Sequence, residues 1–215
     1  MISKSKDNLT LASLVGITGL AGVLLTLPTV SAETEAVDTV TITVPSACSM
    51  SSTITTGNEH TATVDSGTYQ AGIGETTLKT ICNDSNGFSI YAIGYTDDTY
   101  GNTKLKSSLG TTSDVVTGIA TSGNTSNWAM KLTASAGTYA PTIETDTNGS
   151  FANYHVIPST YTKVATFAST TDATNGSALT TTYAVYMNAT QPAGTYEGKV
   201  KYTLVHPASE TPLQP

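Results

Sequence analysis

Arginine is absent from this sequence, and lysine is scarce. The 215 residues contain nine lysines against sixteen aspartates and glutamates. Without residues 1–32, which we expect to be removed, 7 lysines face 15 carboxylates, a net charge of −8. A nucleic-acid partner needs clustered Lys and Arg to neutralise its phosphates. The charge balance therefore excludes nucleic acid and favours a protein kept soluble by an acidic surface.

Catalytic and cofactor-binding motifs are also missing. The three histidines, His60, His155 and His206, stand far apart and form no metal-binding helix motif. The sequence has no G-x-S-x-G nucleophile elbow and no G-x-x-x-x-G-K-[ST] phosphate-binding loop. We therefore expect a protein that is not an enzyme and has no cofactor, with a secreted hydrolase as the distant alternative.

The first 32 residues have the three parts of a secretory signal peptide. Lys4 and Lys6 precede an apolar stretch at residues 9–27, and small residues lead to Ala32, after which we expect cleavage. A retained membrane anchor is the alternative, because a span takes about 20 apolar residues. Gly, Ser and Thr interrupt this stretch, however. The segment predicts a secreted or cell-surface protein that meets a membrane only during export.

The composition favours β-strands. Threonine occupies 43 positions, and 11 tyrosines outnumber 3 phenylalanines. Both Thr and Tyr suit a pleated surface with one wet face. Strict alternation from residue 196 to residue 204 predicts a half-buried final strand, with Lys199 and Lys201 in solvent. The face expected in its core carries Tyr196, Val200, Tyr202 and Leu204.

Other apolar runs are separated by turn residues, and none has convincing helical periodicity. The Asn86-Gly87 turn predicts a strand, a tight turn and a returning strand across residues 82–88. Patterned apolar residues argue against disorder, and several short strands indicate an antiparallel sandwich or barrel. Residues 206–215, with three prolines, resemble a linker. Strands are expected at residues 39–44, 76–82, 88–95, 127–133, 161–167 and 179–188.

Only two cysteines are present, Cys48 and Cys82. An even number of cysteines in an exported protein favours a disulfide. Closing a loop of about 34 residues would contribute roughly 3–4 kcal/mol. Two buried free thiols are the alternative. A structural metal site would need two more ligands, which no histidine supplies at a useful spacing.

Two weaker ligand signals remain. Glu144, Asp146 and Asn148 have the spacing of a calcium loop, but His155 stands where a bidentate glutamate is needed. A plain polar turn therefore explains them better, and no metal is expected. Trp128 is the only tryptophan. We expect it in the core, with a sugar-stacking platform as the alternative.

Several segments, taken in order, resemble one family. They are an alternating strand followed by a cysteine at residues 37–50, an apolar-Gly-aromatic segment at 64–69, the second cysteine strand at 77–82, and two final strands at 182–186 and 192–200. In this order and spacing the chain resembles the spore coat protein U and archaic chaperone–usher pilin family. The resemblance implies an immunoglobulin-like β-sandwich over residues 33–205, bridged between Cys48 and Cys82.

The same resemblance implies a function. Family domains are completed by a neighbour's N-terminal strand, so residues 37–44 would be a donor strand that inserts Val40, Ile42 and Val44. Family domains usually stop at their last strand, whereas this chain continues beyond Val205. The strand can therefore act within its own domain or between subunits. We expect a surface assembly protein that associates with itself or with neighbouring subunits. The alternative is an adhesin-type module whose loops bind a glycan or a host protein.

Overall fold

The computed structural model describes residues 47–54, 60–96, 99–136, 139–169, 171, 176–207 and 211–212. All of them belong to the compact unit Val44–Pro215. The expected signal peptide, the strand expected at residues 39–44 and the end of the proline-containing tail lie outside the described residues. No helix in the described part is long and apolar enough to cross a membrane.

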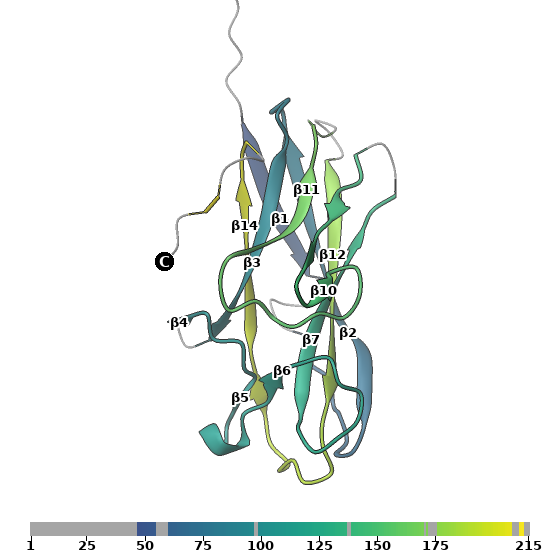
Figure 1. Ribbon diagram of the computed structural model, residues 1–215, viewed down its shortest axis with the longest axis vertical. Helices are drawn as coiled ribbons and strands as arrows, with labels where there is room; N and C mark the ends of the chain where they lie inside the picture. The colour runs from purple at the N-terminus through teal and green to yellow at the C-terminus, as the bar shows by residue number, and fades with distance from the viewer. Residues whose placement is uncertain are drawn as a thin grey trace, which may run out of the picture. The chain divides into compact units, whose positions relative to one another are not determined.

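The described chain is all-β, and most of its strands form two five-stranded sheets (Figure 1). The first sheet is antiparallel except where β6 runs parallel to β7. A single 3₁₀ turn, Thr111–Ser113, is the one helical element among these residues. The first sheet has the order β1 (Cys48–Ile54), β2 (Tyr69–Cys82), β12 (Ser177–Tyr186), β7 (Asn127–Ala134) and β6 (Val116–Thr117).

The second sheet is entirely antiparallel. Its order is β14 (Lys199–Val205), β3 (Phe88–Thr96), β11 (Thr162–Phe167) and β8 (Thr142–Ile143), with β4 (Thr99–Tyr100) paired to β3. Two short ribbons lie outside the sheets. They pair β9 (Thr145–Asp146) with β10 (Gly149–Ser150), and β5 (Lys106–Ser107) with β13 (Tyr196–Glu197).

One apolar core lies between the two sheets. Leu78 and Leu132 of the first sheet and Ile90 of the second belong to the same buried cluster. Phe88 and Phe167 stack across β3 and β11 with ring centroids 4.2 Å apart. Each such side chain contributes about 1.5–3 kcal/mol when it is fully buried. The arrangement confirms the all-β prediction and agrees with a sandwich of two sheets.

The strands expected at the five apolar runs within the described residues are present, in slightly different bounds. The strand, turn and returning strand predicted at residues 82–88 are present, but the two strands do not pair with each other as a hairpin, because β2 and β3 belong to different sheets. The turn itself exists: the Gly87 N–H donates to the Asp84 carbonyl over 3.1 Å. Gly87 has φ 75°, and a Cβ there would lie 2.0 Å from the Phe167 carbonyl oxygen. The Asn-Gly pair predicts a turn, but the sheet to which the strand on either side of the turn belongs depends on strands far away in the sequence.

The predicted final strand is divided in two at Gly198. A Cβ at Gly198 would lie 2.8 Å from a methyl group of Leu105 and 3.1 Å from the Lys104 carbonyl oxygen, so glycine fits here without displacing these neighbours. Beyond it, β14 pairs with β3 and forms the end of its sheet. Lys199 and Lys201 of the predicted polar face are exposed, whereas Thr203 of the same face is half-buried and its hydroxyl is buried without a partner among the described residues. The half-buried side chains that pack against the core are Tyr196, Val200, Tyr202 and Leu204.

Candidate functional site

The strands β1 and β14 contact one another, and each is the end of its own sheet (Figure 1). Both are seven residues long. Within the described ranges, no strand pairs with the outer edge of either one. Such an edge presents a row of backbone N–H and C=O groups that can pair with another chain. We call the outer edges of β1 and β14, together with the side chains beneath them, the open seam.

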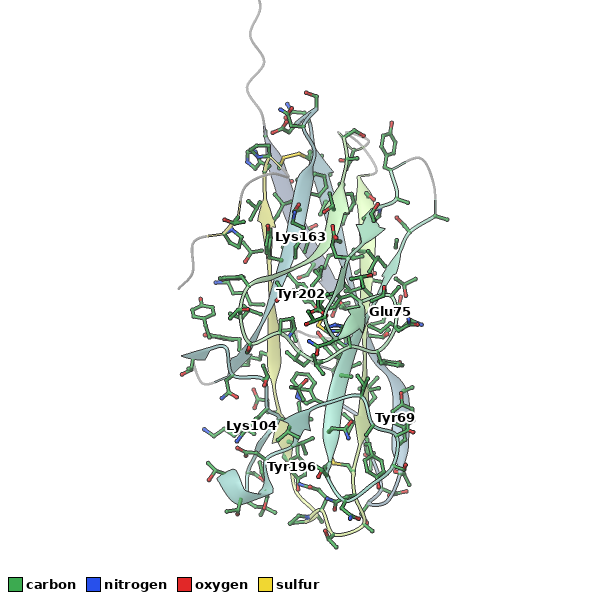
Figure 2. The ribbon with its side chains drawn as sticks, viewed as in Figure 1. Tyr69, Glu75, Lys104, Lys163, Tyr196 and Tyr202 are labelled. Carbon is green, nitrogen blue, oxygen red and sulfur yellow. A yellow bond between two sulfur atoms is a disulfide. The ribbon has the colours of Figure 1, made fainter. Side chains whose placement is uncertain are left out.

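The β1 wall of the seam is fixed at its start. Cys48 lies directly opposite Cys82 in the ladder, and the two are joined by a disulfide, as predicted (Figure 2). The Ala47 N–H donates to Asn83 Oδ1 over 2.6 Å, and the Asn83 N–H returns a bond to the Ala47 carbonyl over 3.1 Å. Met50 packs against the core. The wall is therefore held by covalent, backbone and apolar contacts together.

The side chains of β14 that pack against the core are apolar except for the hydroxyl group of Tyr202. Tyr202, labelled in Figure 2, has its hydroxyl 3.4 Å from the hydroxyl of Tyr183 on β12. Burial, and then the neighbouring Tyr183, raise the pKa of Tyr202 well above 10. Burial likewise raises the pKa of Tyr183. Both phenols are neutral, and the half-buried apolar surface around them suits apolar side chains of an added strand.

The opposite side of the sandwich is sealed residue by residue. Along the outer edge of β7, the Gly118 N–H donates to the Trp128 carbonyl over 2.9 Å. Met130 and His155 then exchange two backbone bonds of 2.9 and 2.7 Å, and the Leu132 N–H donates to the Phe151 carbonyl over 2.8 Å. Every second residue of this edge is thus paired, which leaves little for another chain to bind.

A buried histidine holds this seal in place. The His155 side chain is 1% exposed, with Nε2 2.8 Å from Asp146 Oδ1 and Nδ1 2.8 Å from the Val156 carbonyl oxygen. The ring is therefore held at two points, by the Asp146 carboxylate and by the Val156 carbonyl. Burial tends to raise the pKa of Asp146, but hydrogen bonds from the Asn148 N–H and from His155 outweigh it and hold that pKa below 3.8.

The residues considered as calcium ligands in the sequence, Glu144, Asp146 and Asn148, form hydrogen bonds in and beside this turn. The Asp146 carboxylate accepts from Asn148 N–H over 2.7 Å as well as from His155, while Glu144 Oε1 accepts from the Thr166 hydroxyl over 2.5 Å. The two carboxylates thus have separate partners. Among the described residues, no three His, Cys, Asp or Glu side chains are grouped so that they could hold a metal ion. Asn148 and Gly149 lie in and after the loop of the β9–β10 hairpin.

Trp128 is a core residue, as expected. It is 4% exposed, and its Nε1–H donates to the Thr103 carbonyl over 2.7 Å. Its ring stacks on Tyr183 with centroids 5.9 Å apart. A ring enclosed in this way has no open face for a sugar, so the alternative of a stacking platform is wrong.

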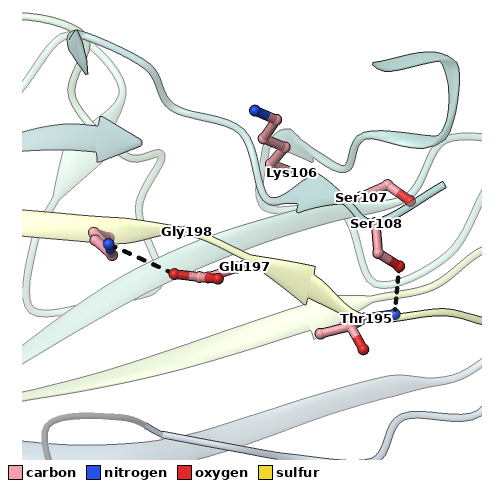
Figure 3. Close-up of a pocket in the computed structure, with 7 residues that line it drawn as sticks. Lys106, Ser107, Ser108, Thr195, Glu197 and Gly198 are labelled. Carbon is pink, nitrogen blue, oxygen red and sulfur yellow. Dashed lines mark hydrogen bonds and ion pairs between the residues drawn. The ribbon is translucent and has the colours of Figure 1, made fainter. Parts of the chain in front are cut away.

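A polar hollow of about 250 Å³ lies between β5 and β13 (Figure 3). Ser108 Oγ accepts from the Thr195 N–H over 3.3 Å, and the exposed Glu197 and Lys199 form an ion pair at 3.6 Å. Sequence reasoning missed this hollow because common residues far apart in the chain form it. Its lining is Lys106, Ser107, Ser108, Thr195, Glu197, Gly198 and Lys199.

Comparisons of the chain with family models, with curated proteins and with solved structures find no match. The residues of the open seam and their geometry are therefore what indicates the function of this protein.

Proposed function

We propose that this protein is an exported surface subunit with an immunoglobulin-like fold that assembles by β-strand addition at the open seam. The observation that carries the proposal is the contrast between the two sides of the sandwich. One side ends in two seven-residue strands whose outer edges have no partner among the described residues, and the other is paired almost completely. A protein that can seal one edge and leaves the other open has an edge suited to a partner strand.

The strand that would be added is residues 37–44, which lie outside the described residues. Val40, Ile42 and Val44 alternate with threonines, so one face is apolar and the other polar. Eight residues match the length of the seven-residue walls. Backbone bonds would supply affinity along the seam, and the three apolar side chains would lie over its floor beside Tyr202.

Addition to a neighbouring subunit is favoured over folding back onto β1. Ala47 is already bonded to Asn83, so only Pro45 and Ser46 would remain to turn the chain in a tight hairpin. Two-residue hairpin loops need positive φ at their first position, and the proline ring fixes φ near −65°. This local conflict supports exchange of the strand between copies.

A peptide of residues 33–46, labelled with a fluorophore, tests the proposal. Added to the chain 33–215 at low protein concentration, it should bind with a rise in anisotropy. A peptide carrying Ile42→Asn should bind about tenfold or more weakly, because a buried isoleucine contributes about 1.5–3 kcal/mol. A Thr41→Asn peptide, altered on the polar face, is the matched control and should bind like the unaltered one.

Sedimentation of the chain 33–215 gives an independent measurement. Oligomers should grow with concentration, and Ile42→Asn in the chain should abolish them while Thr41→Asn does not. A chain that stays monomeric at high concentration and takes up no peptide contradicts the proposal. The adhesin-type module would then be the better reading, with the polar hollow between β5 and β13 as its starting point.

A further inference from the structure

The outer face of the second sheet carries large side chains, as its inner face does. Ile90 and Ala92 of β3 belong to the buried core cluster, so Tyr91, Ile93 and Tyr95, which alternate with them, point to the other side of the sheet. Tyr91 is nevertheless only 5% exposed and Ile93 only 2%. Neighbouring side chains therefore cover the outer face with a layer of their own.

The strand register shows which side chains form this layer. Residues directly opposite each other on neighbouring strands lie on the same face of a sheet. The opposite pairs are Lys199–Tyr95 and Lys201–Ile93 between β14 and β3, Lys163–Tyr91 between β11 and β3, and Tyr100–Tyr95 between β4 and β3. We call these seven residues the tyrosine–lysine face.

The rings and amines of this face contact one another. The Tyr95 and Tyr100 ring centroids are 5.1 Å apart, and Lys163 Nζ is 6.0 Å from the centroid of the Tyr91 ring. Lys201 Nζ donates to the Tyr100 hydroxyl over 2.7 Å and lies 4.5 Å from the centroid of that ring. This hydrogen bond raises the pKa of Lys201, so the amine is charged at neutral pH. Lysine stems and tyrosine rings thus cover the sheet, and the amines stand above them.

The charge of this sheet is opposite in sign to that of the chain. Its described strands contain three lysines and no carboxylate, whereas the chain after residue 32 has 7 lysines and 15 carboxylates. Of the carboxylates that adjoin these strands, Glu197 pairs with Lys199 at 3.6 Å, and Glu144 accepts from the Thr166 hydroxyl. The aspartates at residues 97–98 lie outside the described residues.

The polar hollow between β5 and β13 adjoins the tyrosine–lysine face (Figure 3). Lys199 belongs to both, and Lys106, Ser107 and Ser108 also line the hollow. Lys199 and Lys201 are two residues apart on one face of β14, which separates their Cα atoms by about 7 Å. Hydroxyls, amines and rings therefore follow one another along this strand. A polymer of repeated units can contact them in turn, whereas a single small molecule reaches only a few.

We propose that the tyrosine–lysine face, together with the hollow, binds an acidic polysaccharide. Charge complementarity selects a polyanion, because Lys199 and Lys201 are exposed. The rings select a sugar polymer, whose units have apolar C–H faces that can lie on a tyrosine ring and hydroxyls that can bond to phenol and serine oxygens. This activity is separate from strand addition, which uses strand edges. Each copy in an assembly would present one such face, so weak contacts would add.

A fluorescently labelled oligomer of galacturonic acid tests the inference. The chain 33–215 carrying Ile42→Asn is used throughout, so that the result does not depend on strand addition. The oligomer should bind with a rise in anisotropy, and its affinity should fall as salt is added, because exposed charges are screened. Lys201→Gln and Tyr100→Ala should each weaken binding by about threefold or more.

Matched control variants come from other parts of the chain. Lys131 of β7 has its Nζ 6.0 Å from the centroid of the Tyr154 ring, so Lys131→Gln removes the same kind of contact elsewhere. Tyr139 is 41% exposed, close to the 36% of Tyr100, and Tyr139→Ala removes a ring of similar exposure. Both controls should bind like the unaltered chain. Melting curves check that all four variants fold.

Two further oligomers of the same length separate the alternatives. An uncharged oligomer of glucose and an oligomer of glutamate should each bind more weakly than the galacturonic acid oligomer. Equal binding of the glutamate oligomer would make the face a general anion site and overturn the assignment to a polysaccharide, and equal binding of the glucose oligomer would overturn the selection by charge. Absence of binding, or equal losses in the controls, overturns the inference as a whole. The 33–46 peptide is measured separately, so failure of strand addition is distinguished from failure here.

Discussion

The two sides of the sandwich end in different kinds of strand. On the sealed side the last strands are β6 and β8, each two residues long, and loop residues complete the pairing of β7. On the open side β1 and β14 are seven residues each. Short or covered edge strands are a common protection against unwanted pairing. The chain therefore protects one side and exposes the other, and the exposed side is where a partner is to be sought.

The seal depends on buried side chains as well as on backbone bonds. Phe151 and His155 both pair with β7, and their rings lie against each other with centroids 3.8 Å apart. The open side has no comparable covering segment among the described residues, and of residues 60–66 only His60 and Val64 reach inward, to Thr76 and to the core. A sheet edge is therefore closed by the packing of the side chains that lie over it as well as by its backbone bonds.

The largest expected effect comes from breaking the seal with Phe151→Ala. Phe151 is fully buried, and removing its ring should cost about 3–5 kcal/mol of unfolding free energy. Urea unfolding measures the loss, and light scattering should report aggregation through the β7 edge. Asn153→Ala, on the exposed part of the same loop, should change stability by less than about 0.5 kcal/mol. Equal losses would show that the seal is not specific to the buried ring.

Removing the disulfide should have the next largest effect, on the open side. The double variant Cys48→Ser, Cys82→Ser frees a loop with a sequence separation of 34, for which the chain-entropy estimate gives roughly 3–4 kcal/mol. Thermal unfolding gives the loss, and hydrogen exchange should quicken first in β1. Faster exchange in β7 before β1 would contradict the view that the bridge secures the seam.

The two faces of β14 should respond differently to charge. Tyr202→Asp places a carboxylate over the apolar floor beside Tyr183 and should cost about 2 kcal/mol or more. Lys201→Asp changes an exposed residue that contacts Tyr100, and the expected loss is a few tenths of a kcal/mol. Melting curves of both variants measure the two losses of stability. Similar losses would mean that the face assignment is wrong.

The smallest effect should be the pH dependence of the seal. The pKa of Asp146 is lowered in the folded protein, so its carboxylate stabilises the fold above 3.8 and loses that contribution as the pH falls through the folded pKa. Asp146→Asn should cost about 1 kcal/mol at neutral pH. The difference from the wild-type sequence should shrink as the pH falls below about 4. A difference that is constant with pH would exclude the ionised Asp146 as its source.

Much of the fold follows from local patterns. The runs at residues 88–95 and 127–133 alternate or are continuously apolar, and both are strands. β1 was not expected as a strand, because serines and threonines fill it and only Cys48 and Met50 signal an inward face. The first half of β2 was not predicted as a strand, because Gly72 and Gly74 interrupt its apolar pattern. Both glycines have positive φ.

The candidate site was only partly predictable. The alternation of the last strand and the two cysteines predicted its walls, since both are local signals. Whether β14 is an edge or a central strand depends on its neighbours, and no single segment reveals that. The seal was hidden for the same reason: His155 resembled a failed calcium ligand in sequence, and only the pairing with Met130 shows what it does.

The crossing of the chain from one sheet to the other at residues 83–87 has a consequence for the time course of folding. β2 pairs with β12 about a hundred residues later, for instance Leu78 with Leu179, and β3 pairs with β14 at a similar distance. Ribosomes add about 5–20 residues per second, so β2 and β3 each have an edge that waits several seconds before β12 and β14 exist. Folds dominated by such distant pairings also form slowly, in milliseconds to seconds. A newly made chain thus passes through a period with several unpaired edges at once, during which a holding factor that binds extended segments would protect it from aggregation.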